Sequence, residues 1–152
     1  MAKKEQNPID PEKIHLLQIE PMEISISEVK EPFKLEESVD MKLAHISAHN
    51  LADNRFLLGL DIILTLEDRK PEKSARFRYD FHFAIDNLEQ MLSFDKQNEP
   101  TFSRQFVATL AGISYSTIRG IMFEKLSSSS WGSIIVPVIN PDKILESWIE
   151  IE

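Results

Sequence analysis

Residues 55–85 read R-F-L-L-G-L-D-I-I-L-T-L-E-D-R-K-P-E-K-S-A-R-F-R-Y-D-F-H-F-A-I, and this stretch decides the fold. Large apolar side chains fall on every second residue over 55–67, and again over 75–86. A period of two is typical of a strand with one buried face. The connection between the two runs is charged and contains Pro71, which indicates a turn. The stretch therefore predicts a long antiparallel hairpin with one strongly apolar face.

The two strands also constrain their own pairing. The apolar residues that share one face have even numbers in the first strand and odd numbers in the second strand. The apolar faces coincide only when the numbers of facing residues sum to an odd value. A sum of 141 would oppose Leu60 to Phe81 and Leu64 to Phe77. Aliphatic–aromatic pairs of this kind stabilise a sheet by about 0.2–1 kcal/mol each. Another element has to cover the apolar face that results.

A helix later in the sequence can provide that cover. Apolar residues recur at helical spacing over 102–125, and Thr101 or Ser103 gives a start signal directly after a proline. Gly112 and Gly120 weaken a helix by up to about 1 kcal/mol each. They mark either a break near residue 112 or a place where another backbone comes close.

Two further strands are predicted before the hairpin. Apolar and polar residues alternate over 21–33, where Pro32 favours an edge position or a strand end. A second, weaker strand is predicted over 41–48. The residues that share one face of it are Ala44, Ile46 and Ala48.

The segments after the hairpin have helical or extended character. Residues 87–94 predict a short helix or turn, and 131–142 form an apolar extended segment. Asn140 is suited to an N-cap and Pro141 to the first helical position, so a last helix is predicted over 141–150. Strands come first in the chain and helices follow, which is the pattern of an α+β domain.

Composition limits the classes of protein that the chain can belong to. Its 152 residues suit one domain, predicted over 14–152 behind a flexible N-terminal arm at 1–13. The net charge is -8, and an acidic surface repels phosphate backbones, so nucleic acid is not an expected partner. The absence of cysteine excludes disulfides. No apolar run resembles a secretory signal or reaches the roughly 18 residues of a membrane span, so we expect a cytoplasmic protein.

Catalytic and metal-binding patterns find no support in the sequence. His45 and His49 have the spacing of a helical metal-binding pair, but Ile46 stands where zinc proteases have glutamate, and the local pattern is not helical. The run Ser127–Ser130 predicts a flexible loop rather than a nucleophile, because no histidine lies near it in the sequence. Carboxylates are distributed as surface charge. We expect no metal, no cofactor and no enzymatic activity.

Large apolar side chains are plentiful for a domain of this size: nine Phe, two Tyr and two Trp. Most are expected in the core, and the others at an oligomer face or a peptide groove. Trp131 is the strongest candidate for such a surface. It lies in a loop with small neighbours, where no helical or strand pattern assigns its ring to a buried face.

Residues 55–146, and 113–145 most strongly, resemble the SecB family of export chaperones. Residues 113–126 read I-S-Y-S-T-I-R-G-I-M-F-E-K-L, and 131–145 read W-G-S-I-I-V-P-V-I-N-P-D-K-I-L. The family has here a helix, a short aromatic-containing loop, an extended segment ending in Pro-Val-Asn and a last helix. The residues that match this plan in order are Tyr115, Ile118, Trp131, Pro137, Val138, Asn140 and Leu145. The departures are the serine run, in place of a glycine-bearing loop, and the insertion of Ile139.

The resemblance implies a four-stranded antiparallel sheet with a long helix and a C-terminal helix packed on one side. It implies a homodimer or homotetramer that acts as a holdase, with surface grooves for unfolded polypeptide or preprotein and delivery to the translocase motor SecA. Some SecB-like members instead serve toxin–antitoxin systems, so an adaptor or structural oligomer that binds one specific partner is the alternative. The residues expected near a client peptide are Phe77, Tyr79, Ile113, Met122 and Trp131.

Overall fold

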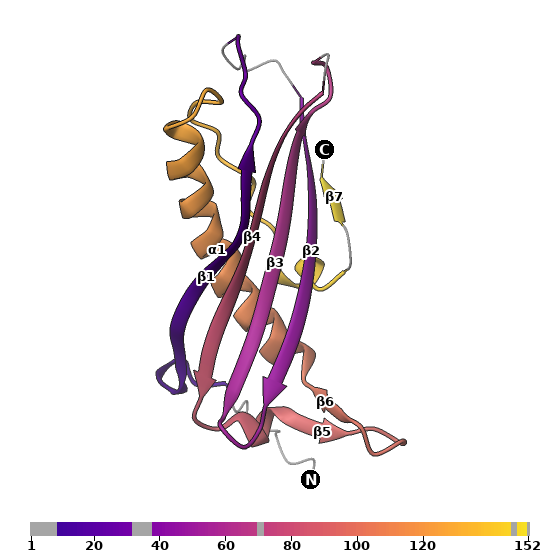
Figure 1. The fold of residues 1–152 in the computed structure, drawn as a ribbon. Helices are drawn as coiled ribbons and strands as arrows, with labels where there is room; N and C mark the ends of the chain where they lie inside the picture. The colour runs from indigo at the N-terminus through magenta and orange to yellow at the C-terminus, as the bar shows by residue number, and fades with distance from the viewer. Residues whose placement is uncertain (1–8, 32–37, 70–71, 147–148, 152) are drawn as a thin grey trace.

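The computed structural model describes residues 9–31, 38–69, 72–146 and 149–151. Its long strands are β1 (Ile14–Ile26), β2 (Val39–Asn50), β3 (Arg55–Leu66) and β4 (Lys73–Ile85). They pair antiparallel in the order β1-β4-β3-β2, and the short strand β7 (Ile149–Ile151) joins the sheet beside β2 (Figure 1). The other elements are η1 (Pro11–Lys13), η2 (Leu88–Met91), β5 (Leu92–Phe94), β6 (Pro100–Phe102), α1 (Arg104–Ser127) and α2 (Pro141–Ile144).

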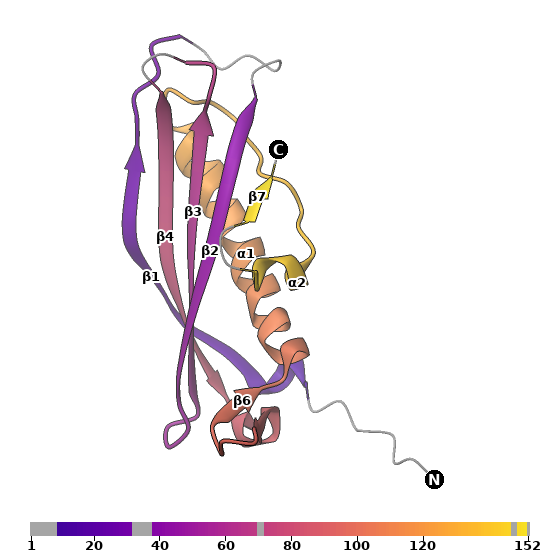
Figure 2. The ribbon, with the colours of Figure 1, turned by 90° about the vertical axis from the view of Figure 1, so that its right-hand side faces the viewer.

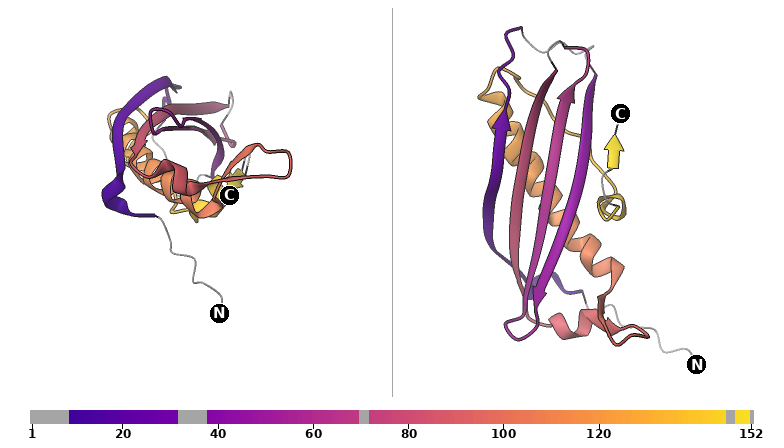
Figure 3. Two further views of the ribbon diagram at one scale, coloured as in Figure 1. Left: turned by 90° about the horizontal axis from the view of Figure 1, so that it is seen from below. Right: turned by 45° about the vertical axis from the view of Figure 1, so that its right-hand side comes forward.

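Helix α1 covers one face of the sheet, as the sequence predicts. It lies against β3 and β4, and α2 lies on the same side (Figure 2). It crosses the sheet diagonally, from β6 at its N-terminal end to the side of β1 at its C-terminal end (Figures 1 and 3). The α+β class, the long antiparallel sheet and the placement of the helices on one side are therefore confirmed.

Strands β3 and β4 form the predicted hairpin with the predicted buried face. Facing residue numbers sum to 139, so Leu60 faces Tyr79 and Ile62 faces Phe77. The parity prediction is confirmed, whereas the predicted sum of 141 is wrong by two. The difference arises at the turn, because pairing continues through Ser74 and Lys73, which the sequence pattern assigned to the connection.

Strand β1 begins well before the predicted strand at 21–33. It starts at Ile14, ends at Ile26 and forms one edge of the sheet. An edge strand tolerates a proline in its interior, and Pro21 occupies such a position beside a register irregularity. Pro32 lies outside the described residues. So does most of the predicted N-terminal arm, of which residues 11–13 form the turn η1.

Strand β2 is longer than predicted and buries the other face. Its core residues are Met41 and Leu43, which pair with Leu64 and Ile62 of β3. The predicted set of Ala44, Ile46 and Ala48 therefore points to the side of the sheet that lacks helices. The side chain of Ile46 is 51% exposed there.

Helix α1 starts at the predicted position and runs without a break. The Ser103 hydroxyl accepts a hydrogen bond from the Phe106 amide at 3.2 Å and caps the helix. A break at Gly112 is excluded, and the close neighbour is the side chain of Pro141 and not another backbone: a Cβ at Gly112 would lie 3.2 Å from Cγ of Pro141. The glycine thus lets the C-terminal segment pack closely on α1.

The last helix is much shorter than the predicted 141–150. It comprises a single turn, α2, capped by the side chain of Asn140. Residues 149–151 are strand β7, which pairs antiparallel with Met41–Leu43 of β2. The prediction of helix there is wrong, because β2 is an edge strand whose unpaired backbone offers hydrogen bonds to an extended segment. The sheet accordingly has four long strands and this short fifth one.

We expect Gly59→Ala to lower the free energy of unfolding by about 1–3 kcal/mol. An added Cβ would lie 2.7 Å from Oδ1 of Asp80 and 2.8 Å from Cγ1 of Ile46, and Asp80 is buried. Gly120→Ala is the control: its Cβ meets nothing within 4 Å, so helix propensity should raise stability by about 0.5–1 kcal/mol. Urea denaturation followed by circular dichroism measures both. Equal stability of Gly59→Ala and wild type would contradict this packing.

Candidate functional site

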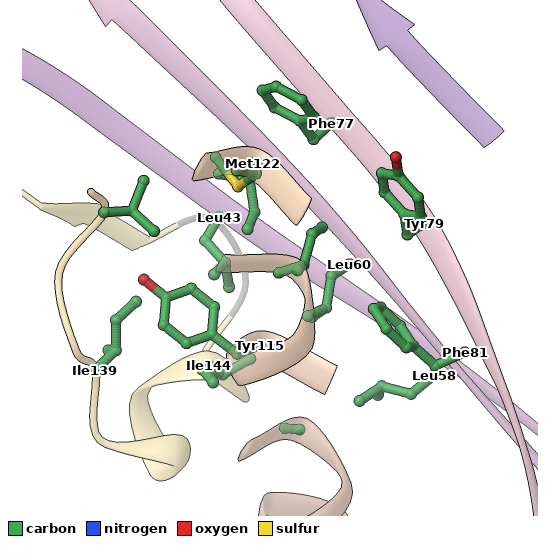
Figure 4. Close-up of a cluster of buried hydrophobic side chains, with 14 of the residues drawn as sticks. Leu43, Leu58, Leu60, Phe77, Tyr79, Phe81, Tyr115, Met122, Ile139 and Ile144 are labelled. Carbon is green, nitrogen blue, oxygen red and sulfur yellow. The ribbon is translucent and has the colours of Figure 1, made fainter. Parts of the chain in front are cut away.

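Four of the five residues predicted near a peptide lie in the core of the protomer. Phe77, Tyr79 and Met122 pack between the sheet and α1, as Figure 4 shows. Trp131 is buried as well, whereas Ile113 is 37% exposed on the outward side of α1. Only Ile113 is placed to touch a partner directly in this conformation. Contact of all five with a peptide stays a prediction.

The indole of Trp131 is held in a buried position by a contact with a residue far away in the sequence, which the local sequence pattern does not reveal. Its side chain is 1% exposed, and its Nε1–H donates to the Ser27 carbonyl oxygen at 2.7 Å. The neighbouring serine run is also held in place rather than flexible. Its Ser130 hydroxyl accepts from the Val29 amide at 2.8 Å, and its Ser129 hydroxyl donates to the Leu126 carbonyl at 2.7 Å.

Two side chains of α1 fix the extended segment that follows the serine run. Tyr115 donates its hydroxyl hydrogen to the Pro137 carbonyl, and Arg119 Nε donates to the Val136 carbonyl at 3.1 Å. Burial raises the pKa of Tyr115 to about 12. The inserted Ile139 faces the core, and it packs near Tyr115 and Ile144 (Figure 4). This segment closes the corner of the apolar face on the β2 side of α1.

The opposite corner, on the β1 side, stays open. We name the β1 face by its half-exposed apolar side chains, which are Leu16, Leu17, Ile19, Met22 and Ile24. Leu16, Ile19 and Ile24 pair with Phe83, Phe81 and Phe77, so they point to the same side as the core. Their exposed fractions lie between 36% and 40%, and the sheet strands that α1 mainly contacts are β3 and β4.

The sequence pattern predicted the part of the β1 face that lies in the strand at 21–33, with Met22 and Ile24, but missed Leu16, Leu17 and Ile19 for a definite reason. The register of β1 shifts between Leu16 and Gln18, and again between Pro21 and Glu23. Each shift interrupts the alternation of apolar and polar residues, so the first half of the strand shows no steady period of two. A search that allows for β-bulges in apolar segments would have found this strand.

The second open feature is the free edge of β2, which we define as Ala44–Asn50. Strand β7 pairs only with Met41–Leu43, and the free edge has no strand partner on that side among the described residues. Two hollows of the sheet include its residues. One of about 250 Å³ extends from Ala44–Ile46 to residues of β3 and β4, and one of about 530 Å³ extends from Ala48–Asn50 across β3 and β4 to Leu17 and Gln18 of β1.

Helix α2 lies against the inward side of the free edge, at His45. Burial lowers the pKa of His45, although a hydrogen bond with the backbone of Ile144 acts in the opposite direction. His49, further along the edge, packs edge-on against Phe102 with ring centroids 4.9 Å apart. Four residues of strand separate the two histidines by about 13 Å, too far for both to bind one metal ion. Within the described residues no group of three potential metal ligands occurs.

The sheet face without helices has balanced charge. Arg76 forms a two-point contact with Asp61, with nitrogen–oxygen distances of 3.0 and 2.7 Å, and lies 3.7 Å from Glu23. His82 lies 3.5 Å from Glu20 on the same face. Acidic and basic side chains are both present on this face, so it is not a uniformly acidic surface.

Comparison with known proteins places the fold. No family model matches the sequence, and no curated protein matches it either. Among solved structures, the chain is similar to the Mycobacterium tuberculosis SecB-like chaperone Rv1957 in complex with a ChAD peptide from the Rv1956 HigA1 antitoxin. The TM-score is 0.60, with 84% of this chain and 91% of that chain covered, at 10% sequence identity.

The fold is SecB-like. The resemblance noted over 113–145 is thus confirmed at the level of structure, including the long helix, the extended segment and the short helix after it. At 10% identity the likeness concerns the backbone arrangement. What this SecB-like chain binds has to be argued from its own surface.

We expect Tyr115→Phe to destabilise the protein by about 1 kcal/mol near pH 8, because the Pro137 carbonyl loses its donor. The folded-state pKa of about 12 lies above the unfolded value of about 10, so the neutral phenol stabilises the fold fully below pH 10. That contribution is lost as pH rises from about 10 to 12. The deficit of Tyr115→Phe should therefore shrink above pH 10 in urea titrations. A deficit that stays constant would show that burial does not raise this pKa.

Proposed function

We propose that this chain is a non-enzymatic cytoplasmic chaperone that holds extended segments of unfolded polypeptide. The free edge of β2 is the observation that supports the proposal. Its backbone donors and acceptors lack a partner strand among the described residues, its Ile46 side chain is exposed, and its residues contribute to two hollows of the sheet. An extended segment adds to such an edge through main-chain hydrogen bonds. Because every sequence has the same main chain, this kind of recognition suits a holdase.

The β1 face supports self-association of the chaperone. It is a strip of half-exposed apolar side chains on an edge strand, a combination that soluble proteins usually cover. The outward side of α1 adds to it, since Ile113, Ser116, Gly120 and Phe123 carry no charge there. We infer a homo-oligomer, a dimer or tetramer, in which these surfaces meet. The buried Phe77, Tyr79, Met122 and Trp131 would then hold the core together without contacting the peptide, and Ile113 would lie near a subunit boundary.

A second function, an adaptor for one specific partner segment, is supported by the similar structure, which was solved with an antitoxin peptide. The mixed charge of the sheet face without helices also favours the adaptor over delivery to SecA, because the resemblance to SecB implies that SecA is engaged through an acidic sheet surface. The two functions differ in how many partners bind. A holdase binds many unfolded chains, and an adaptor binds one.

The first test is suppression of aggregation. The protein should prevent aggregation of a reduced, unfolded model protein at near-stoichiometric amounts, and it should bind a labelled extended peptide. Ser47→Arg places a long charged side chain in the middle of the free edge, where Ser47 is exposed. It should weaken peptide binding by about tenfold, or about 1.4 kcal/mol.

Ser47→Thr is the matched control, because threonine suits a strand and adds no charge. It should bind the peptide as wild type does, measured by fluorescence anisotropy. Binding of a single partner peptide without suppression of aggregation would establish the adaptor instead. If neither activity occurs, both functions are wrong.

The second test concerns assembly. The protein should elute at a multiple of its 17.5 kDa chain mass in size-exclusion chromatography with light scattering. Replacing Leu16 and Ile19 together by Asp should reduce that mass, because charges would be buried without partners in the contact. Val138→Asp, at a position 82% exposed elsewhere, is the control and should keep the wild-type mass. A wild-type protein that is monomeric would refute the role given to the β1 face.

A further inference from the structure

The C-terminal strand β7 occupies part of the same edge that the proposed function assigns to a peptide. β2 runs over Val39–Asn50, and β7 pairs antiparallel with its residues Met41–Leu43. The free edge, Ala44–Asn50, continues directly from there. The chain therefore places its own extended segment in line with the position of a bound one.

The pairing between β7 and β2 is short. It involves three residue pairs, at the short end of the range for strands. The turn before it is well anchored: Asn140 caps α2, Ile144 is fully buried, and Pro141 packs on Gly112 of α1. The segment can therefore leave β2 at β7 while α2 stays in place.

We propose that β7 is an internal competitor that sets the length of the segment that β2 accepts, an inference that rests on the proposed function. The free edge offers seven positions, 44 to 50, over about 24 Å of extended chain. A segment of that length pairs without disturbing β7. A longer one can also pair with Met41–Leu43, but only where it displaces β7, so this additional binding is reduced by the fraction of molecules in which β7 is paired.

Two peptides of alternating Val and Thr, seven and twelve residues long and each with a terminal Lys, test this inference. Their affinities are compared for wild type, for a chain ending at Glu146, and for Glu150→Pro, which removes an amide from β7. Glu150→Thr loses the same charge but keeps a strand-forming residue, and is the matched control. Amide hydrogen exchange of residues 41–43 reports independently whether β7 is paired.

The shortened chain and Glu150→Pro should bind the twelve-residue peptide about fivefold or more tightly than wild type does. The seven-residue peptide should bind all four proteins equally, and Glu150→Thr should follow wild type. Exchange at residues 41–43 should accelerate when β7 is removed. Equal gains for both peptides, or no gain for either, would overturn the role of β7 and leave the proposed function standing. Failure of both peptides to bind any form would overturn both.

Discussion

The apolar face shared by β3 and β4 is the constraint on which the rest of the structure depends. Every second residue of these strands is buried there, and a face of this kind is stable only when another layer removes it from water. A helix of 24 residues is about 36 Å long, close to the length of the strands that it covers. Because α1 lies along the diagonal, it covers the centre of the face and leaves two corners.

The two corners are treated differently, and the proposed activities follow from this difference. On the side of β2 the chain closes the corner itself, with a segment that Tyr115 and Arg119 hold against α1. That segment continues into α2 and β7 and so stops partway along the edge of β2. On the side of β1 nothing among the described residues closes the corner, and Leu16 and Ile19 stay half exposed. The proposed peptide binding and self-association are thus assigned to the two sides of the sheet, at β2 and at β1, that α1 does not cover.

Sequence periodicity was sufficient for the central hairpin and its covering helix, because both depend on local patterns of apolar residues. It was insufficient wherever a distant element decided the outcome. Parity alone allowed every register with an odd sum, and the turn selected the sum of 139. Residues 149–151 pair with β2 instead of extending α2, and Trp131 is buried by a contact with Ser27. The candidate site was missed for a related reason, since a free strand edge is a property of the assembled sheet and has no residue signature.

The hydrogen bond from Trp131 to Ser27 joins residues 104 positions apart, near the ends of α1 and β1. A contact that closes so long a loop forms late in folding, after the hairpin of β3 and β4, whose partners are near in sequence. Emission from Trp131, in a chain where Trp148 is replaced by Phe, should therefore lag behind the far-ultraviolet signal of the sheet during refolding. Simultaneous changes would place the packing of Trp131 against Ser27 in the rate-limiting step itself. The fluorescence of Trp131 therefore reports directly when the segment after α1 packs against the end of β1.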